Sequence, residues 1–583
     1  MTIYAWLILL LLGVWYILFY KFYGGYFHKR IAEAKDENIT PAHKYFDGID
    51  YVPANKYILY GHHVGAIAGT GPIAGPTMAM AWGWLPGILW IAIANVVLGA
   101  VHDYLALIAS IRHEGKTIAF VSGQVLSKRT QYIFQWYILF ALILVIAAFV
   151  IFDVQVFMST PSTATAILWF MPIAIFVGVL IYKLNFKLPY AVVTGLVLLL
   201  LAMYAGYKLP LVINNFNAWI TILLIYGWMA GWLPLWYFLQ PRDFLNVYIM
   251  WGGIILGVIG LILARTPIQL DALSSFTWKV VGGQPSPVYP TIVLVIACGA
   301  LSGFHSLVAS GTTARQLNSE LDARAIGYGG MLTEGLVAMT VALSVATMIP
   351  FAYSYYNNVP LDQVLANKSV LYNYVVSSTL PSFIRSYGFV WYKAFDIPLA
   401  IGTLFAGLWF ATFDFAVLDT TNRLARFTWN EIVEPLRIRA PTAHKILSNR
   451  YLGSLVALLI GGSLAYTGAL NYVYPAFAGA NQLLAALALI TTSSYVYYEL
   501  RRSLKQSLLA FVPAFFLWIT VTSALFWYEF KVAIPKLQTG LATGNGTAIY
   551  LGASLSTMVA ILLILDILLI LEFINVTRKK RKK

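Results

Sequence analysis

The sequence has little charge and almost no cysteine. Of its 583 residues only 10% are charged, whereas 60% are hydrophobic and the mean hydropathy is +0.75. A water-soluble surface needs more charge than this, so the composition excludes a soluble globular protein and indicates an integral membrane protein. The single cysteine, Cys298, cannot form an intrachain disulfide, and we expect it to be a small buried packing residue.

Long polar segments are also few. The three longest loops, residues 21–57, 353–394 and 413–449, lack the length and the apolar content of an independent soluble domain. There is no GxxxxGK[ST] motif for nucleotide phosphates and no HExxH zinc motif. These absences argue against an ATPase, a kinase or a zinc protease. We therefore expect a protein that is not an enzyme and that needs no cofactor or metal.

Apolar runs recur along the whole chain instead, each near the roughly 20 residues that a helix needs to cross a bilayer. Stretches such as residues 133–152 are apolar on every face, which predicts helices and not the alternating strands of a barrel. We therefore expect an all-α polytopic membrane protein with about fifteen transmembrane helices. Their centres lie near residues 11, 69, 98, 142, 174, 197, 228, 255, 301, 340, 403, 459, 485, 518 and 561.

Lysine and arginine are unevenly distributed between alternate loops. With the N-terminus outside and the C-terminus inside, 30 of the 38 basic residues fall in cytoplasmic loops and 8 in external loops. Because cytoplasmic loops are enriched in Lys and Arg, this distribution predicts a multi-pass protein of the cytoplasmic membrane with that orientation. The basic tail, residues 577–583, is then a topology anchor and not a nucleic-acid-binding segment.

One apolar run, GHHVGAIAGTGPIAGP at residues 61–76, is rich in glycine and proline. Neither residue favours a continuous helix, so we expect the helix to break near Gly69 to Pro72. Bare backbone at membrane depth is tolerated where it lines a cavity, as at the discontinuous helices of many transporters. Close packing through small residues is the other interpretation, but it does not explain His62, His63 or Thr70.

A second run, CGALSGFHSLVASGTT at residues 298–313, is also interrupted by small residues, and we expect its break near Ser310 to Thr312. Aligning His63 with His305 gives the pattern H-x5-G-T in both runs, and the two runs cross the membrane in opposite directions. This predicts an inverted repeat, with both breaks adjoining a polar cavity. The expected divisions are an N-terminal helix and loop at 1–57, a first repeat at 58–264, a second repeat at 290–576 and the basic tail.

Polar residues in other spans add candidates. Asp103 is costly in a membrane unless it is paired or hydrated, so it is either functional or a structural partner of Arg112 or of a neighbouring helix. Asp419 and Arg423 can pair at i,i+4 beside Asn422, as a gate or as a structural ion pair. The remaining candidates are two adjacent amides that either line a cavity or fasten helices, Asn481 and Gln482.

Together these motifs resemble the carbon starvation protein A (CstA) family of membrane transporters. The resemblance covers residues 61–486 and rests on GHHVGAIAGTGPIAGP, GAVHDYLALIASIRHEG, SGFHSLVASGTTARQLNSELDARAIGYGGMLTEG, LDTTNRLARF and FAGANQLLAALAL. The chain departs from the family pattern at Val64, Thr70, His102 and Ala314, where phenylalanine, alanine, glutamine and proline are usual. These departures question an essential role for the Thr70 hydroxyl and for His102.

The resemblance implies uptake of a small nutrient, a peptide or pyruvate, across the cytoplasmic membrane during starvation. Both substrates carry a carboxylate, which suits the positive N-terminal ends of broken helices. The residues expected to bind substrate are Gly69, Thr70, Gly71, Ser306, Ser310, Gly311, Thr312, Asn481 and Gln482. Those expected to carry a coupling proton are His62, His63, Asp103 and His305.

Other functions remain open at this stage. The intramembrane histidines could instead hold a metal or a haem, which would make the chain a membrane metalloprotein. A passive channel is disfavoured because no ring of acidic or carbonyl motifs recurs. The coupling ion, proton or sodium, and the oligomeric state do not follow from the sequence.

Overall fold

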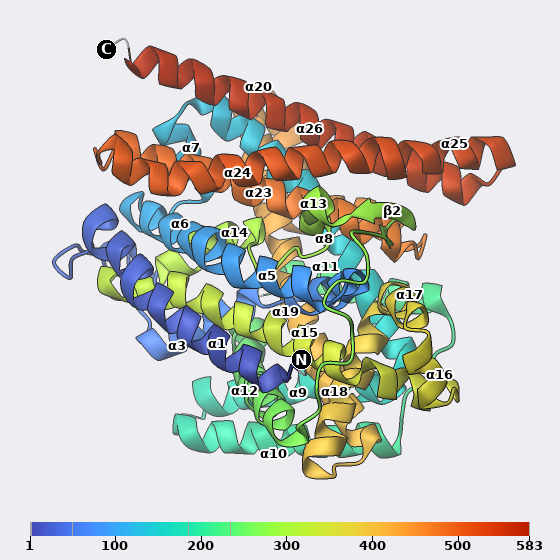
Figure 1. Cartoon of the computed structure of the whole chain (residues 1–583). Coiled ribbons are helices and arrows are strands. Elements are labelled where there is room, and N and C mark those ends of the chain that lie inside the picture. Colours follow the sequence, from blue (N-terminus) through green and yellow to red (C-terminus); the bar gives the residue numbers. More distant parts are fainter. Residues whose placement is uncertain (1–2, 49, 185, 234, 582–583) are drawn as a thin grey trace.

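The computed structural model describes residues 3–48, 50–184, 186–233 and 235–581 (Figure 1). Within this part of the chain, eleven helices are long and apolar enough to cross a membrane. The only strands described, β1 (Thr277–Val281) and β2 (Gln284–Pro287), form one antiparallel hairpin. The fold is therefore the all-α membrane protein that the composition predicts.

Each of the other four expected spans has a shorter counterpart. Two are the apolar helices Phe216–Trp232 and Arg450–Ala465. The other two are the glycine-rich runs, which are split into short helices near residues 69 and 301. The total of fifteen crossings stays a prediction, because these four segments fall short of the length that a membrane-spanning helix needs.

The first half of the chain contains twelve of the α-helices and four short π or 3-10 segments, which continue or join them. In chain order they are α1 (Ala5–Phe19), η1 (Tyr20–Gly24), η2 (Phe27–Ala32), α2 (Pro41–Lys44), α3 (Lys56–Ile67), α4 (Gly71–Ala79), η3 (Met80–Trp82), α5 (Trp84–Ala94), η4 (Asn95–Gly99), α6 (Ala100–Arg112), α7 (Ile118–Val125), α8 (Lys128–Ser159), α9 (Pro161–Tyr182), α10 (Leu188–Lys208), α11 (Phe216–Trp232) and α12 (Leu235–Ala264).

The second half begins with the hairpin and ends on two long helices that run along one edge of the bundle, α24 and α26 (Figure 1). Its helices are α13 (Val288–Thr291), η5 (Ile292–Leu294), α14 (Gly303–Gly311), η6 (Thr313–Arg315), η7 (Glu320–Asp322), η8 (Arg324–Tyr328), α15 (Gly329–Asn357), α16 (Leu361–Ala366), α17 (Ser369–Ser377), α18 (Thr379–Phe395), α19 (Leu399–Val433), α20 (Leu436–Arg439), α21 (Pro441–Leu447), α22 (Arg450–Ala465), α23 (Leu470–Tyr498), α24 (Leu504–Tyr528), η9 (Glu529–Ala533), α25 (Ile534–Thr543) and α26 (Gly546–Arg581).

The first glycine-rich run breaks where its sequence predicts. Helix α3 ends at Ile67, and α4 begins at Gly71 with a proline in its first turn. Proline is compatible with a helix start because its missing N–H has no helical partner there. We call residues 68–70, which lie between the two helices, the first break.

The second run breaks earlier than expected. The chain is non-helical over residues 295–302, which we call the second break, and α14 then runs to Gly311. The prediction of a break near Ser310 to Thr312 is therefore wrong, because these residues end α14 and lead into η6. The H-x5-G-T alignment also does not superpose the two breaks, since the first break follows His63 and the second precedes His305. The inverted repeat stays a prediction.

The segment 353–394, expected to be a loop, is largely helical. It contains the end of α15, the short helices α16 and α17, and most of α18. Helix α18 buries one face, including Phe383 and Tyr387, and packs against α12, α15 and α19. Its apolar residues lie on a single face, so mean hydropathy did not distinguish it from a loop.

Candidate functional site

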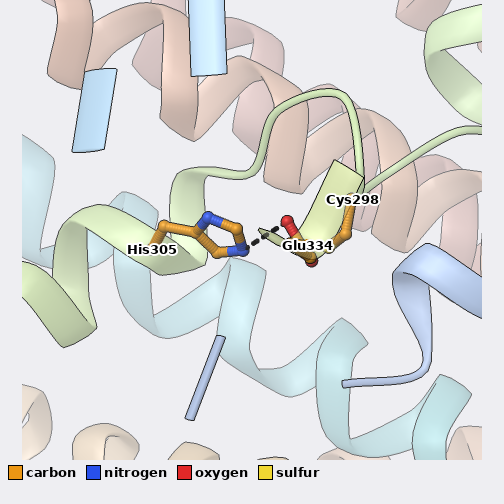
Figure 2. A group of neighbouring side chains, drawn as sticks. All are labelled: Cys298, His305 and Glu334. Carbon is orange, nitrogen blue, oxygen red and sulfur yellow. Dashed lines mark ion pairs between the residues drawn. The ribbon is translucent and has the colours of Figure 1, made fainter. Parts of the chain in front are cut away.

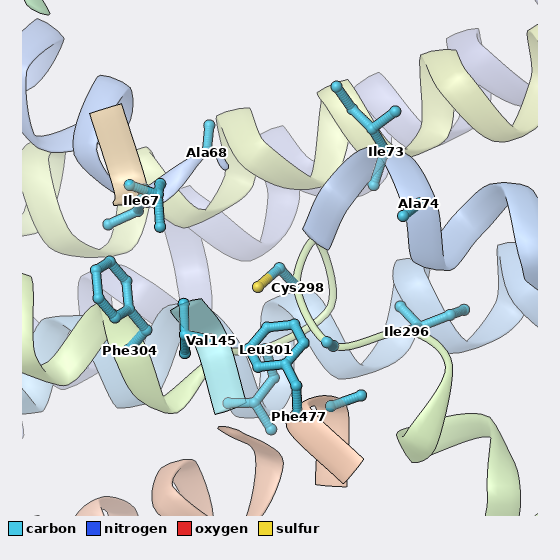
Figure 3. Packing of buried hydrophobic residues seen from close by; sticks show 14 of the residues in the cluster. Ile67, Ala68, Ile73, Ala74, Val145, Ile296, Cys298, Leu301, Phe304 and Phe477 are labelled. Atoms are coloured by element: carbon cyan, nitrogen blue, oxygen red, sulfur yellow. The ribbon is translucent and has the colours of Figure 1, made fainter. Parts of the chain in front are cut away.

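The two breaks pack directly against each other, and glycine makes this approach possible. A Cβ atom on Gly71 would lie 2.4 Å from Sγ of Cys298, and one on Gly75 would lie 2.4 Å from the carbonyl oxygen of Val295. Figure 3 shows Cys298 beside residues of both α3 and α4. Gly299 in the second break has φ +79°, a conformation that favours glycine. The expectation that the two broken runs are neighbours is therefore confirmed.

Two adjacent amides of α23 hold the second break in place. Asn481 Nδ2 donates to the carbonyl oxygen of Ala297 at 3.0 Å. Gln482 Nε2 donates to the carbonyl oxygens of Ile296 and Leu301, each at 2.9 Å. Buried carbonyls that have lost their helical partners are costly unless another donor replaces them. These amides therefore fasten α23 to the broken segment, one of the two roles open from sequence.

Side chains from other helices complete this support. The Tyr474 hydroxyl donates to the first carbonyl of the second break at 2.7 Å, and Asn95 Nδ2 donates to the carbonyl of Gly299 at 2.8 Å. At the start of α14, the backbone N–H of Phe304 donates to Asn481 Oδ1 at 2.9 Å. First-turn N–H groups have no partner within their own helix, so Asn481 satisfies one of them. Residues far apart in sequence thus stabilise the unwound backbone.

Four ionisable side chains form a connected chain beside the breaks: His102 and Asp103 of α6, His305 of α14 and Glu334 of α15. All four are completely buried. His102 Nδ1 lies 2.7 Å from Asp103 Oδ1, and His305 Nδ1 lies 2.9 Å from Asp103 Oδ2. His305 Nε2 lies 3.5 Å from Glu334 Oε2. We call this set the His–carboxylate chain.

The His–carboxylate chain has one exchangeable proton position that its geometry defines. When Asp103 is ionised it only accepts, so both rings carry a proton on Nδ1. A further proton can then reside on His305 Nε2 as an imidazolium or on the Glu334 carboxyl. From sequence alone Glu334 is, like Asp103, either functional or a structural partner, and its proximity to His305 becomes visible only when α15 packs against α6.

Cys298 lies next to the end of this chain (Figure 2). The ligand atoms of Cys298, His305 and Glu334 all lie within 4.8 Å of one another. Thiolate, imidazole and carboxylate are all common zinc ligands, so these residues could hold a metal ion. Within the part of the chain that the structure describes, this group supplies three ligands, one fewer than a closed structural zinc site needs.

His63 connects the two broken runs. Its Nδ1 lies 2.9 Å from Oγ1 of Thr313, just beyond α14, and the residue is fully buried. His62 is partly exposed. Thr70 is buried in the first break, and its hydroxyl has no hydrogen-bond partner among the described residues. Of the two adjacent histidines, His63 is thus the one directed to the site.

The other expected substrate-binding residues separate into two groups along α14. Ser306 lies in the first turn and donates to the carbonyl oxygen of Gly303 at 2.7 Å. Gly311 ends the helix five residues later, about 7.5 Å from Ser306 at 1.5 Å per residue. At that end, Ser310 accepts a hydrogen bond from the N–H of Ile118 at 3.0 Å, and the Thr312 hydroxyl donates to a helix carbonyl. The structure therefore places Gly71, Asn481 and Gln482 in contact with the second break. Gly69 and Thr70 lie in the first break, Ser306 lies in the first turn of α14, and Ser310, Gly311 and Thr312 lie at its other end.

The polar residues of α19 have different partners from those expected. Asp419 forms a buried ion pair with Arg242 and accepts a hydrogen bond from the Tyr226 hydroxyl at 2.8 Å. Arg423 donates to the carbonyl of Ala230 in α11 at 3.0 Å and to that of Leu233, the residue after this helix, at 2.7 Å. Asn422 Nδ2 donates to another carbonyl of α11 at 2.8 Å. These contacts fasten α11 and α12 to α19.

One side of the bundle carries a network of surface ion pairs. Glu33 pairs with Arg502 at 2.8 Å, and this guanidinium holds the pKa of Glu33 below its ordinary value. His113 pairs with Glu499 at 3.2 Å; burial lowers the pKa of His113, but this contact and its bond to a backbone carbonyl raise it more, so the pKa is above its ordinary value. Lys580 donates to a carbonyl at the end of α7. These contacts join segments that are far apart in sequence, on the side that the distribution of basic residues predicts to be cytoplasmic.

Comparison with known proteins identifies the family. Residues 4–524 match the family model described as carbon starvation protein CstA. The chain belongs to the CstA family. Its members are membrane transporters, so this chain is a transporter and not an enzyme.

Individual relatives cover most of the chain. The peptide transporter CstA of Bacillus subtilis is 30% identical over 560 residues, covering 90% of this chain and 91% of that protein. The pyruvate/proton symporter BtsT of Escherichia coli is 28% identical, covering 88% of this chain and 80% of that protein. Among solved structures, a mutant of the manganese transporter of Eremococcus coleocola shares 13% identity, with a TM-score of 0.46, covering 90% of this chain and 97% of that one. That last likeness is too weak to inform function.

Proposed function

We propose that this CstA family member imports a small carboxylate-bearing nutrient, a peptide or pyruvate, across the cytoplasmic membrane during carbon starvation, driven by protons. The observation that carries the proposal is the His–carboxylate chain, which is fully buried and adjoins the second break at Cys298. An ionisable residue inside a membrane span is expensive and points to a functional site. A connected set of imidazoles and carboxylates is the chemistry that a proton relay needs.

The two breaks supply the substrate site in this proposal. Helices α4 and α14 both begin at a break, at Gly71 and Gly303, so their first N–H groups and positive dipole ends face the junction. That potential favours a carboxylate, which peptides and pyruvate share. The buried hydroxyl of Thr70, which lacks a partner among the described residues, is available to a ligand. Proton binding by Asp103, His305 or His63 then changes the charge beside the substrate.

Uptake into proteoliposomes tests the proposal. Purified protein would be reconstituted, and accumulation of labelled pyruvate and of labelled dipeptides measured with and without imposed pH and sodium gradients. We expect a pH gradient that is acidic on the side from which the substrate enters to drive accumulation of one of these substrates. Accumulation that follows sodium alone, or that needs no gradient, would contradict proton coupling. The substrate that accumulates decides between peptide and pyruvate.

The competing function is a membrane metalloprotein, which one observation favours: Cys298, His305 and Glu334 form a group with ligand atoms within 4.8 Å. Metal analysis of the purified protein, together with visible absorption for haem, distinguishes the two. The transporter proposal expects neither in stoichiometric amount. A stoichiometric metal lost from a Cys298→Ser variant would assign the group to metal binding instead.

A further inference from the structure

A second pair of ionisable side chains lies inside the bundle, apart from the His–carboxylate chain. Asp153 of α8 and Asp414 of α19 are both completely buried. The two helices pack along each other, and the two carboxyl groups lie within hydrogen-bonding reach. We call Asp153 and Asp414 the carboxyl pair.

Within the part of the chain that the structure describes, no hydrogen-bond donor reaches the carboxyl pair. All four of its oxygens lack a hydrogen-bond partner among the described residues. Asp419, on the same helix as Asp414, has both Arg242 and the Tyr226 hydroxyl as partners. Asp419 is also the further charge that acts on Asp153, and it too is acidic. Among the described residues, the charges that act on the pair are therefore all acidic.

Aromatic rings pack around this part of α8 and α19. Phe152, the neighbour of Asp153, packs against Phe410 and Tyr474, with ring centroids 6.4 Å and 5.3 Å away. Phe415, the neighbour of Asp414, packs against Phe157 at 5.9 Å. Apart from the tyrosine hydroxyl, these rings offer no oxygen atom that could coordinate an ion. The hard metal ions found in proteins take six or more oxygen ligands, more than two carboxyls provide.

A proton shared between the two carboxyl groups stabilises this arrangement. An ionised carboxylate inside a membrane is energetically costly, and two adjacent carboxylates also repel each other. One proton removes one charge and turns one carboxyl into a donor for the other. We propose that Asp153 and Asp414 share one proton and form a second protonation site of this protein.

The carboxyl pair is connected to both breaks. Phe152 packs against Tyr474, whose hydroxyl donates to the carbonyl of Val295 in the second break. On α19, Val417 packs against Gly69 of the first break. A Cβ atom added to Gly69 would lie 2.6 Å from Cγ2 of Val417. Loss of the shared proton leaves two like charges that separate α8 from α19, and both breaks contact this interface. If the transporter is proton-driven, as proposed above, the pair carries a second coupled proton.

Infrared spectroscopy tests the shared proton without any transport assay. At neutral pH the purified full-length protein should show the carbonyl stretch of a protonated carboxylic acid that the Asp153→Asn/Asp414→Asn double variant loses. An Asp103→Asn variant is the matched control and should keep this band. Identical spectra of wild type and double variant would overturn the proposal. A band that sodium removes at constant pH would also overturn it, because the ligand would then be sodium.

Thermal unfolding provides a second measurement, for the case that the double variant does not fold. A folded protein that holds a proton the unfolded chain has released loses stability as pH rises. The single variants Asp153→Asn and Asp414→Asn keep the size and hydrogen bonding of the side chain, and their melting temperatures should fall less with rising pH than that of wild type. An unchanged pH dependence in both would contradict the shared proton. Proteoliposome uptake insensitive to pH gradients would refute proton-driven transport but leave the infrared result standing.

Discussion

His63 joins the two broken runs through its contact with Thr313, and its position suits a group that binds a proton where substrate also binds. In a His63→Gln variant the amide can still form hydrogen bonds but cannot be protonated at ordinary pH. We expect substrate affinity to change by less than about tenfold, or about 1.4 kcal/mol. Accumulation driven by a pH gradient should fall to the level without a gradient. Uptake and equilibrium binding, measured side by side, check this.

His43→Gln is the matched control, because His43 is exposed and belongs to neither of the two broken runs. Its accumulation should equal that of wild type. If His63→Gln accumulates substrate with an unchanged pH dependence, His63 does not carry the proton, and that role passes to His62 or Asp103.

His102 is expected to hold Asp103 in place and not to carry the coupling proton. It lies 2.7 Å from Asp103, and glutamine, usual at this position in the family, could donate the same hydrogen bond. We expect His102→Gln to accumulate substrate like wild type. His102→Leu should lose about 1–3 kcal/mol of stability, because it leaves a buried carboxylate without one donor. Thermal unfolding and uptake check both variants. Loss of pH-driven uptake in His102→Gln would show that the ring itself is needed.

The approach of one broken element to the other depends on the absence of a side chain at Gly71. A Cβ there would lie 2.4 Å from both Cβ and Sγ of Cys298. We expect Gly71→Ala to cost about 1–3 kcal/mol through overpacking and to reduce uptake. The control is Gly13→Ala, where the added Cβ would have no atom within 4 Å. Adding Cys298→Gly to Gly71→Ala should restore uptake in part. A Gly71→Ala protein indistinguishable from wild type in melting temperature and uptake would show that the breaks do not pack in this way.

The sequence predicted the first broken element better than the second for a physical reason. Around residue 70 the local residue types determine where the helix breaks, because Gly69, Gly71 and Pro72 all disfavour a continuous helix. At residues 295–302 the sequence is mostly apolar, and the chain unwinds where distant amides replace the helical donors. Serine and glycine near residue 310 gave a stronger local signal but lie at an ordinary helix end. Tertiary partners of this kind are not visible in a local pattern.

At the scale of the whole molecule, the distribution of basic residues predicts the orientation. We expect a cysteine placed at Glu114 or Lys445 to react with a membrane-impermeant maleimide only after cells are opened, and one at Asp362 to react in intact cells. All three positions are exposed, whereas the native Cys298 is buried and should not react. Labelling of Glu114→Cys or Lys445→Cys from outside intact cells would overturn the orientation.

The long-range pairings of the molecule mark the limit of sequence reasoning. Motif and hydropathy identified His63, Asp103, His305, Asn481 and Gln482 as candidates, and the structure places all of them beside the breaks or in contact with a neighbour that is. The partners are what the sequence could not predict. Glu334 faces His305, Arg242 faces Asp419, and Asp153 faces Asp414, each across a helix contact with no fixed sequence separation. Such pairs become visible only when the helices are packed.

The central claim is that the buried His–carboxylate chain couples transport to protons, and Asp103→Asn tests it most directly. Asparagine keeps the size of Asp103 and still accepts a hydrogen bond, but it cannot carry the charge. In vesicles with the membrane potential clamped at zero, a pH gradient of about one unit should support about tenfold accumulation of substrate by wild type for each coupled proton. The Asp103→Asn protein should exchange labelled for unlabelled substrate across the membrane yet accumulate none. Full gradient-driven accumulation by Asp103→Asn would contradict the claim.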